Sequence, residues 1–249
     1  MPEQGKTTQT HTAIVTGGSA GIGKAICKHL LDDGHHVISL ARRDPDFSHD
    51  NLTSYRVDLG DTDATKATAQ DIAANHDVTA LVHNAGVIRP ALIEDVKPQD
   101  LDFLTHLHLG AGITLLQAAL PSMKACGYGR VVNMSSRAVV GLPTRTVYAG
   151  TKAALIAMTR TWAMELGPHG ITVNAIAPGP VVTDMFTEVV PEESDKATAL
   201  AKSLPMQRLG TADDIARTTL FFLDPRNDWI TGQTLFVCGG ASLGSLTFN

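Results

Sequence analysis

The stretch HTAIVTGGSAGIG, residues 11–23, decides the fold. It predicts a short β-strand from His11 to Thr16, a glycine-rich turn, and then a helix that runs toward Gly34. Glycines let the backbone approach a phosphate closely, and the N-terminus of the following helix favours its charge. The spacing is GxxxGxG rather than the commoner GxGxxG, and a tight strand-to-helix turn would need similar residues. A second strand at 36–40 completes the pattern of a nucleotide-binding unit.

The same alternation of strands and helices continues to the end of the chain. We expect further strands at 54–57, 78–82, 130–134, 171–177 and 234–238, with helices at 63–75, 101–126, 148–166 and 211–223. Pro121 should kink or break the second of these helices. The alternation predicts one doubly wound α/β domain of the Rossmann type over residues 11–249. Residues 1–10 should form a disordered polar tail, and the acidic segment 184–206 should form a lid.

Composition narrows the class of protein. The 249 residues are 43% hydrophobic and carry 20 Lys plus Arg against 25 Asp plus Glu, a net charge of −5. This balance argues against nucleic acid or an anionic membrane as a partner. No uninterrupted apolar run approaches the ~18 residues of a membrane span, and the N-terminus does not resemble a signal peptide. Three scattered cysteines, Cys27, Cys126 and Cys238, favour a reducing cytoplasm and no metal site.

The residues after the second strand indicate which cofactor the turn would bind. A carboxylate that holds a free ribose 2′-hydroxyl would stand about 20 residues past the glycines. Ala41, Arg42 and Arg43 stand there instead, and a guanidinium group can pair with a 2′-phosphate. Alternatively, the two arginines bind no cofactor and are only solvated charges before the loop that follows. The sequence therefore favours NADP(H) over NAD(H), with Arg42 as the stronger candidate.

A second cluster of reactive residues follows the strand at 130–134. Ser135 and Ser136 come first, and Tyr148 and Lys152 follow on a helix, four residues apart and so on one helix face. An ammonium group beside a phenol should lower the tyrosine pKa from about 10 toward working pH. Such a tyrosine can pass a proton to or from a hydroxyl group. The YxxxK spacing alone is weak, because such pairs are common on solvated helix faces.

Five ordered motifs together carry a resemblance. TGGSAGIG at 16–23, NAG at 84–86, Ser136, YxxxK at 148–152 and PGPVVT at 178–183 resemble those of the short-chain dehydrogenase/reductase family over nearly the whole chain. The resemblance implies that Tyr148 is the catalytic acid/base, that Lys152 assists it, and that Ser136, rather than Ser135, polarises the substrate oxygen. It also implies a homotetramer. The implied cofactor-binding residues are Gly17, Ser19, Gly21, Ile22, Gly23, Arg42, Asp58, Leu59, Asn84, Ala85, Gly86, Tyr148, Lys152, Pro178, Gly179, Val181 and Thr183.

Two positions depart from the family pattern. His108 stands where the family has an asparagine that helps hold a water of its proton relay. An imidazole near Lys152 could hold that water and also titrate, which would add an acidic-limb ionisation to the pH–rate profile. Alternatively, His108 only fills the helix face. Cys238 replaces an aspartate before Gly239 and should change C-terminal packing. His106 and His108 are two residues apart, so a zinc pair is not expected.

These observations predict an NADP(H)-dependent oxidoreductase that interconverts a ketone and a secondary alcohol on a small-molecule substrate. The first alternative is a 3-oxoacyl-acyl-carrier-protein reductase. Such reductases need cations at the cleft mouth for the acidic carrier, and the matching positions here are Gly127 and His169. The second alternative is a dinucleotide-binding sensor or scaffold with little turnover, which only His108 favours.

Overall fold

The computed structural model describes residues 10–187, 190–191 and 194–243. The expected tail falls almost entirely outside them. Strand β1 (Thr12–Thr16) leads through the glycine turn into α1 (Gly21–Asp32), and β2 (His36–Ala41) pairs parallel to β1. Gly17 and Gly21 both have positive φ, 71° and 52°, which allows the sharp turn. The nucleotide-binding unit predicted at residues 11–40 is thus formed.

Seven parallel strands make one sheet in the order β3-β2-β1-β4-β5-β6-β7. The remaining strands are β3 (Leu52–Arg56), β4 (Val78–His83), β5 (Gly129–Met134), β6 (Ile171–Pro178) and β7 (Thr234–Val237). The inner strands β4, β5 and β6 are buried at every position, as expected of a parallel sheet covered on both faces. The predicted single-domain, doubly wound α/β fold is confirmed.

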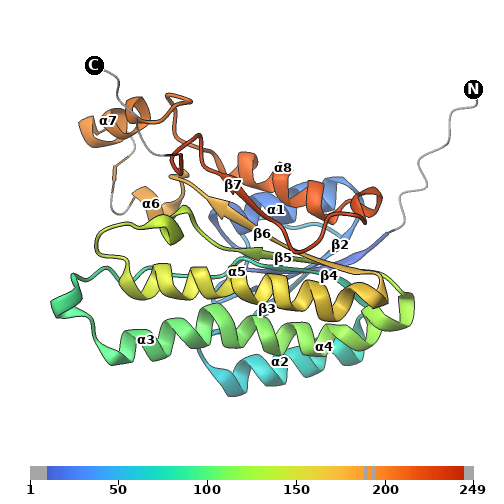
Figure 1. Ribbon diagram of the computed structural model, residues 1–249. Coiled ribbons are helices and arrows are strands. Elements are labelled where there is room, and N and C mark those ends of the chain that lie inside the picture. The colour runs from blue at the N-terminus through green and yellow to red at the C-terminus, as the bar shows by residue number, and fades with distance from the viewer. Residues whose placement is uncertain (1–9, 188–189, 192–193, 244–249) are drawn as a thin grey trace, which may run out of the picture.

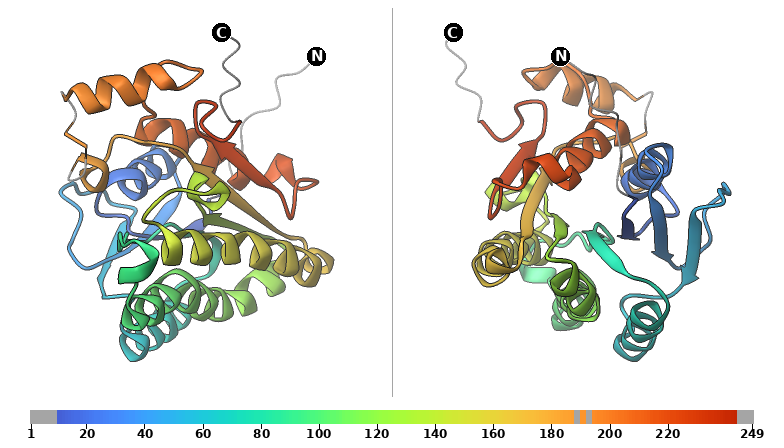
Figure 2. Two further views of the ribbon diagram at one scale, coloured as in Figure 1. Left: turned by 60° about the vertical axis from the view of Figure 1, so that its left-hand side comes forward. Right: turned by 90° about the vertical axis from the view of Figure 1, so that its right-hand side faces the viewer.

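Helices cover both faces of the sheet (Figures 1 and 2). Helices α1 and α8 (Ala212–Leu223) pack together on one face over a core that includes Ile26, Val82 and Ile215. On the other face lie α2 (Thr62–Asn75), α4 (Ala111–Cys126) and α5 (Thr146–Leu166), over a core that includes Ile14, Leu115 and Val173. Short helices complete the chain: η1 (Ile93–Asp95), α3 (Pro98–Thr105), η2 (His106–Gly110), η3 (Arg137–Val140), η4 (Gly167–His169), α6 (Asp184–Thr187), α7 (Asp195–Ser203) and η5 (Pro225–Asn227).

The helix expected at 101–126 differs from its prediction in three ways. It begins earlier, at Pro98, and its α3 and α4 parts are joined by η2, a π-helical turn. It also continues through Pro121 without a break. From Pro98 to Cys126 it is long and apolar enough, by length and composition alone, to cross a membrane, which scanning for uninterrupted apolar runs had not indicated. Its residues Leu107, Leu115 and Met123 lie in the core against the sheet, which explains that composition.

Candidate active site

The carboxyl ends of β1, β4, β5 and β6 bring the predicted motifs to one edge of the sheet. β1 leads into the glycine turn, β4 into Asn84-Ala85-Gly86, β5 into Ser135-Ser136, and β6 into the segment Gly179–Thr183. Parallel strands end at a common edge, and open α/β sheets bind ligands there. A methyl group at Gly21 would lie 3.3 Å from Thr183 Cγ2, so the first and last of these segments touch.

The glycine turn is shaped by contacts that leave no room for side chains. A Cβ at Gly23 would lie 2.1 Å from the carbonyl oxygen of Gly17 and 2.8 Å from Asn84 Nδ2. Asn84 Nδ2 in turn donates to the carbonyl oxygen of Thr16 at 2.9 Å, which ties the NAG segment to the end of β1. Ser19, on the turn, and Ile22, in the first turn of α1, are both half-buried. The turn therefore fits a phosphate held by backbone N–H groups.

The two arginines after β2 have different surroundings. Both are exposed, but Arg43 pairs with Asp184 at 3.3 Å, whereas Arg42 forms no ion pair with any residue that the structure describes. The end of β2 lies beside the glycine turn, since Gly17 N donates to the Leu40 carbonyl at 2.7 Å. Farther along the edge, Asp58 is exposed and caps Gly60 N, and Leu59 is buried. Arg42 is thus free to meet a 2′-phosphate.

Ser136, Tyr148 and Lys152 come together as predicted. Lys152 is 3% exposed, and its Nζ donates to the Met134 carbonyl at 2.7 Å and lies 5.8 Å from the centre of the Tyr148 ring. The Ser136 hydroxyl accepts from Ala138 N at 3.1 Å, and it lies close enough to the Tyr148 phenol to act on the phenol's pKa. Ser135 is buried and donates to the Lys152 carbonyl at 2.8 Å, so it supports α5 rather than facing a substrate.

The expected direction of the Tyr148 pKa is wrong for the protein alone. Burial raises it above its ordinary value, and the Ser136 hydrogen bond and the Arg145 charge offset this only in part. Burial also lowers the pKa of Lys152 to about 7. The physical reason is that the charged form of each group loses water in the interior. Helix spacing shows that the two groups are close but does not show how deeply they are buried.

His108 lies beside Lys152, as expected, and both of its ring nitrogens have hydrogen-bond partners in the protein. Its Nδ1 meets Thr151 Oγ1 at 2.9 Å, and its Nε2 accepts from Val87 N at 3.3 Å. Burial, followed by the charges of Lys152 and His83, lowers its pKa to about 2. Both ring nitrogens therefore have protein partners, and the ring stays neutral at working pH. The expected acidic-limb ionisation has no basis in this geometry, and neither ring nitrogen is left to hold a relay water.

Sequence reasoning missed His83, the last residue of β4. Its ring is 1% exposed, with Nε2 2.9 Å from the His108 carbonyl and Nδ1 3.3 Å from Thr16 Oγ1. A Cβ at Gly112 would lie 2.9 Å from His83 Cδ2, so a glycine on α4 makes room for the ring. The HNAG tetrapeptide at 83–86 is the one local signal that could have drawn attention to it.

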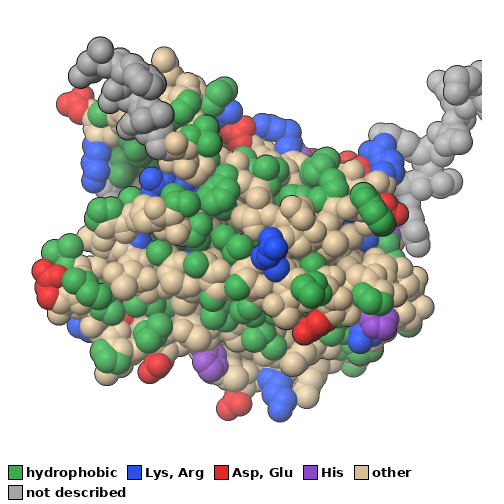
Figure 3. Space-filling model, viewed as in Figure 1, with side chains coloured by type: hydrophobic (Ala, Val, Ile, Leu, Met, Phe, Trp, Pro, Cys, Tyr) green, Lys and Arg blue, Asp and Glu red, His purple; other side chains and the backbone are tan. Residues whose placement is uncertain are grey.

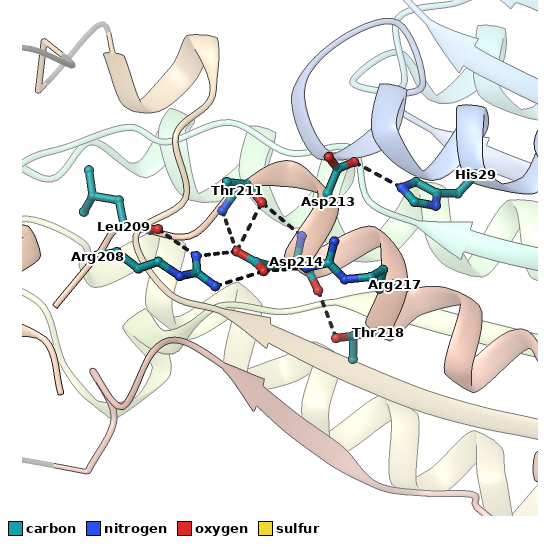
Figure 4. A network of polar contacts seen from close by, with 8 residues as sticks. All are labelled: His29, Arg208, Leu209, Thr211, Asp213, Asp214, Arg217 and Thr218. Carbon is teal, nitrogen blue, oxygen red and sulfur yellow. Dashed lines mark hydrogen bonds and ion pairs between the residues drawn. The ribbon is translucent and has the colours of Figure 1, made fainter. Parts of the chain in front are cut away.

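A network around Asp214 anchors the segment after β6 (Figure 4). Asp214 forms a capping box with Thr211 at the start of α8 and pairs with Arg208 and Arg217, each at 2.7 Å. Hydrogen bonds from Arg208 and from Thr211 hold its pKa well below the usual range. Gly210, between Arg208 and Thr211, exchanges backbone hydrogen bonds with Pro180 and Val182 at 2.9 Å. The network thus holds Val181 and the neighbouring Thr183 at the site.

Cys238 packs near the C-terminal end of the described chain. It is buried, its Sγ lies 3.2 Å from Ser242 Oγ, and a Cβ at Gly179 would lie 2.6 Å from its Cα. The thiol therefore packs beneath the segment after β6.

Comparison with known proteins gives a consistent result. The family model described as enoyl-(acyl carrier protein) reductase matches residues 17–242. A 3-oxoacyl-[acyl-carrier-protein] reductase, FabG, of Rickettsia bellii is 34% identical over 233 residues, 92% of this chain and 95% of that protein. A solved short chain dehydrogenase/reductase family protein is 34% identical with a TM-score of 0.84, over 94% of this chain and 98% of its own. ElxO with NADP bound is 28% identical with a TM-score of 0.86, over 95% of this chain and 100% of its own.

Proposed function

The chain belongs to the short-chain dehydrogenase/reductase family, and we propose that Ser136, Tyr148 and Lys152 carry out its chemistry. It is an NADP(H)-dependent oxidoreductase that interconverts a ketone and a secondary alcohol. The observation that supports the assignment of residues most strongly is that Ser136, Tyr148 and the buried Lys152 lie together at the sheet edge that carries the glycine turn, with Lys152 Nζ 5.8 Å from the centre of the Tyr148 ring.

In this proposal the glycine turn would hold the pyrophosphate of the cofactor, Arg42 would pair with its 2′-phosphate, and Thr183 and Lys152 would bind its nicotinamide half. The bound cofactor supplies or accepts the hydride. The Ser136 hydroxyl accepts from Ala138 N, which leaves its proton to be donated, and in this proposal the proton goes to the substrate oxygen. In reduction, negative charge grows on that oxygen, which Ser136 stabilises and Tyr148 protonates. Lys152 holds the end of β5 against α5 and adds positive charge when protonated.

The substrate in this proposal is a small hydroxy or keto compound. The second candidate is a 3-oxoacyl group on acyl carrier protein, which the FabG relative at 34% identity supports. A carrier needs fixed cations, and neither Gly127 nor His169 supplies one; both also stand just before β5 and β6, at the opposite edge of the sheet from the site. A 3-oxoacyl thioester offered on the carrier and on a short thiol distinguishes them: a clear preference for the carrier would favour the second candidate.

A homotetramer is the assembly that we propose. The face that α4 and α5 present to solvent shows few charged side chains and several hydrophobic ones (Figure 3). Met164 on α5 is 81% exposed, and Leu101 and Ile113 on the neighbouring helix are 49% and 38% exposed. Covering them in a helix-to-helix interface would remove apolar surface from water. Light scattering of the protein and of Met164→Arg tests this, with a smaller particle expected for the variant.

The experiment that tests the function is a screen of ketones with NADPH and of alcohols with NADP⁺, read at the nicotinamide absorbance and repeated with NADH and NAD⁺. We expect turnover of at least one pair, with the phosphorylated cofactor preferred. Tight NADPH binding without turnover on any substrate would instead favour the sensor or scaffold. Residues 184–206, whose described parts include α6 and α7, remain our proposed lid over the substrate, and the protein is proposed to act in the cytoplasm.

A further inference from the structure

The hydrogen-bond partners of His83 determine which of its ring nitrogens carries the proton. A carbonyl oxygen can only accept, so His83 Nε2 must carry the proton that it shares with the His108 carbonyl at 2.9 Å. In a neutral ring Nδ1 is then the acceptor, and it receives the hydroxyl proton of Thr16 at 3.3 Å. Thr16 Oγ1 itself accepts from Asn84 N and Ala85 N, both at 2.8 Å. His83 is therefore satisfied at both nitrogens.

The same reasoning fixes His108 in the opposite tautomer. The amide of Val87 can only donate, so His108 Nε2 accepts and Nδ1 carries the proton. Nδ1 donates to Thr151 Oγ1 at 2.9 Å, and Thr151 Oγ1 donates to the Tyr148 carbonyl at 3.0 Å. The two imidazoles thus lie in one chain of hydrogen bonds, which leads from the strand before the glycine turn to the backbone of Tyr148.

This chain of hydrogen bonds passes through the π-helical turn η2, the irregular part of the helix beside the site. His83 is the only described side chain that hydrogen-bonds the carbonyl oxygen of His108, and it does so from a buried strand. The His108 ring also meets the Tyr148 ring edge-on, with 5.7 Å between centroids. A shift of η2 would move His108, and with it Thr151 and the tyrosine.

We propose that His83 is a positioning residue: it fixes η2 and, through His108 and Thr151, sets the position of Tyr148 relative to a cofactor bound at the glycine turn. This role rests on the proposed function of Tyr148 but adds a residue that neither touches the substrate nor exchanges its proton. Gly112 is needed for the same arrangement, because any larger residue at this position would collide with the His83 ring.

Nuclear magnetic resonance of the imidazole nitrogens tests the geometry without any substrate. We expect His83 to be protonated at Nε2 and His108 at Nδ1, each as a single unaveraged tautomer, with signals assigned from His83→Gln and His108→Asn. The reverse tautomer at either residue, or averaging between two, would overturn the proposal. This readout stays decisive if the protein turns over no substrate, so failure of the function and failure of the chain of hydrogen bonds are separable.

Kinetics on the substrate found by the screen test the consequence. His83→Phe and Gly112→Ala should lower kcat roughly tenfold or more, because displacements near ~1 Å cost about that or more, while the NADPH dissociation constant changes less than about threefold. His83→Gln keeps a donor near the His108 carbonyl and should recover most of the rate. Gly110→Ala is the matched control on the same helix, since its methyl would lie 3.9 Å from the nearest atom, His106 Cδ2.

Equal kcat in Gly112→Ala and Gly110→Ala would overturn the proposal, as would a His83→Gln variant as slow as His83→Phe. If His83→Phe does not fold, the Gly112→Ala and Gly110→Ala pair decides. A purely structural role would lower the melting temperature of the folded variants and leave kcat at the level of the control.

Discussion

His108 donates from Nδ1 to Thr151 Oγ1 at 2.9 Å, so the π-helical turn and the helix of Tyr148 are joined inside the protein. The bond lies in the interior, with His108 0% and Thr151 4% exposed. Protonating a histidine in such a place costs free energy, because the charged ring would lose its water. His108 and its neighbour His83 have pKa values lowered to about 2 and about 4, in each case chiefly by burial.

This relationship predicts how stability falls in acid. The unfolded chain takes up protons near the ordinary histidine pKa of 6.5, whereas the folded protein does not until the pH is far lower. For each histidine, the free energy of unfolding therefore falls by about 1.4 kcal/mol per pH unit as the pH drops below about 6.5, because only the unfolded chain binds the proton. Urea unfolding of His108→Asn between pH 4.5 and 6 should show a slope smaller by about one proton.

The control for that measurement is Thr151→Val, which removes the hydrogen bond and keeps the imidazole. It should lower the free energy of unfolding by about 1–2 kcal/mol at neutral pH without changing the slope in acid. The same slope in the unmutated protein and in His108→Asn would mean that His108 is protonated in the folded state.

Arg42 should determine the preference for the phosphorylated cofactor. Arg42→Ala is expected to weaken NADPH binding at least tenfold, about 1.4 kcal/mol, and to leave NADH binding almost unchanged. Arg43→Ala is the matched control, because Arg43 is held by Asp184 at 3.3 Å. Calorimetric dissociation constants for both cofactors provide the measurement, and equal affinities for NADPH and NADH in the unmutated protein would contradict the assignment.

Deprotonation of Lys152 should cause the rate of reduction to fall as the pH rises through neutrality. Burial lowers its pKa to about 7, so the protein without cofactor loses the ammonium charge as the pH rises through that value. The neutral amine contributes no charge to assist proton transfer, and kcat/KM for reduction should fall above about pH 7. Lys152→Arg keeps a charge throughout this range, and its kcat/KM, though reduced, should lose that limb. An unchanged limb in this variant would assign the ionisation to another group.

Much of this fold could be predicted because its signals are local. The glycine turn, the alternation of elements and the Thr211 cap of α8 lie in short stretches, and each predicted strand agrees with the structure to within about two residues. The π-turn at HLHLG was missed because one extra residue in a helical turn hardly alters the apolar periodicity. The motifs also placed Ser136, Tyr148 and Lys152 together correctly.

What could not be predicted at the site depends on burial and on distant partners. The pKa directions of Tyr148 and Lys152 follow from loss of water, which helix spacing does not report. His83 acts on the His108 carbonyl only because Gly112 leaves space for its ring, and those three positions meet only in the folded chain.

The central claim is that Tyr148 transfers the proton, and Tyr148→Phe tests it most directly. The change removes a hydroxyl and little packing, so NADPH binding should stay within about threefold while turnover falls by ~10²-fold or more. Tyr128→Phe is the control, since among the described residues the Tyr128 hydroxyl hydrogen-bonds only the Leu223 carbonyl, at 3.4 Å, and Tyr128 precedes β5, at the opposite edge of the sheet from the site. Loss of turnover with NADPH still bound is the predicted result; a Tyr148→Phe protein that keeps more than about a tenth of the rate would contradict the account.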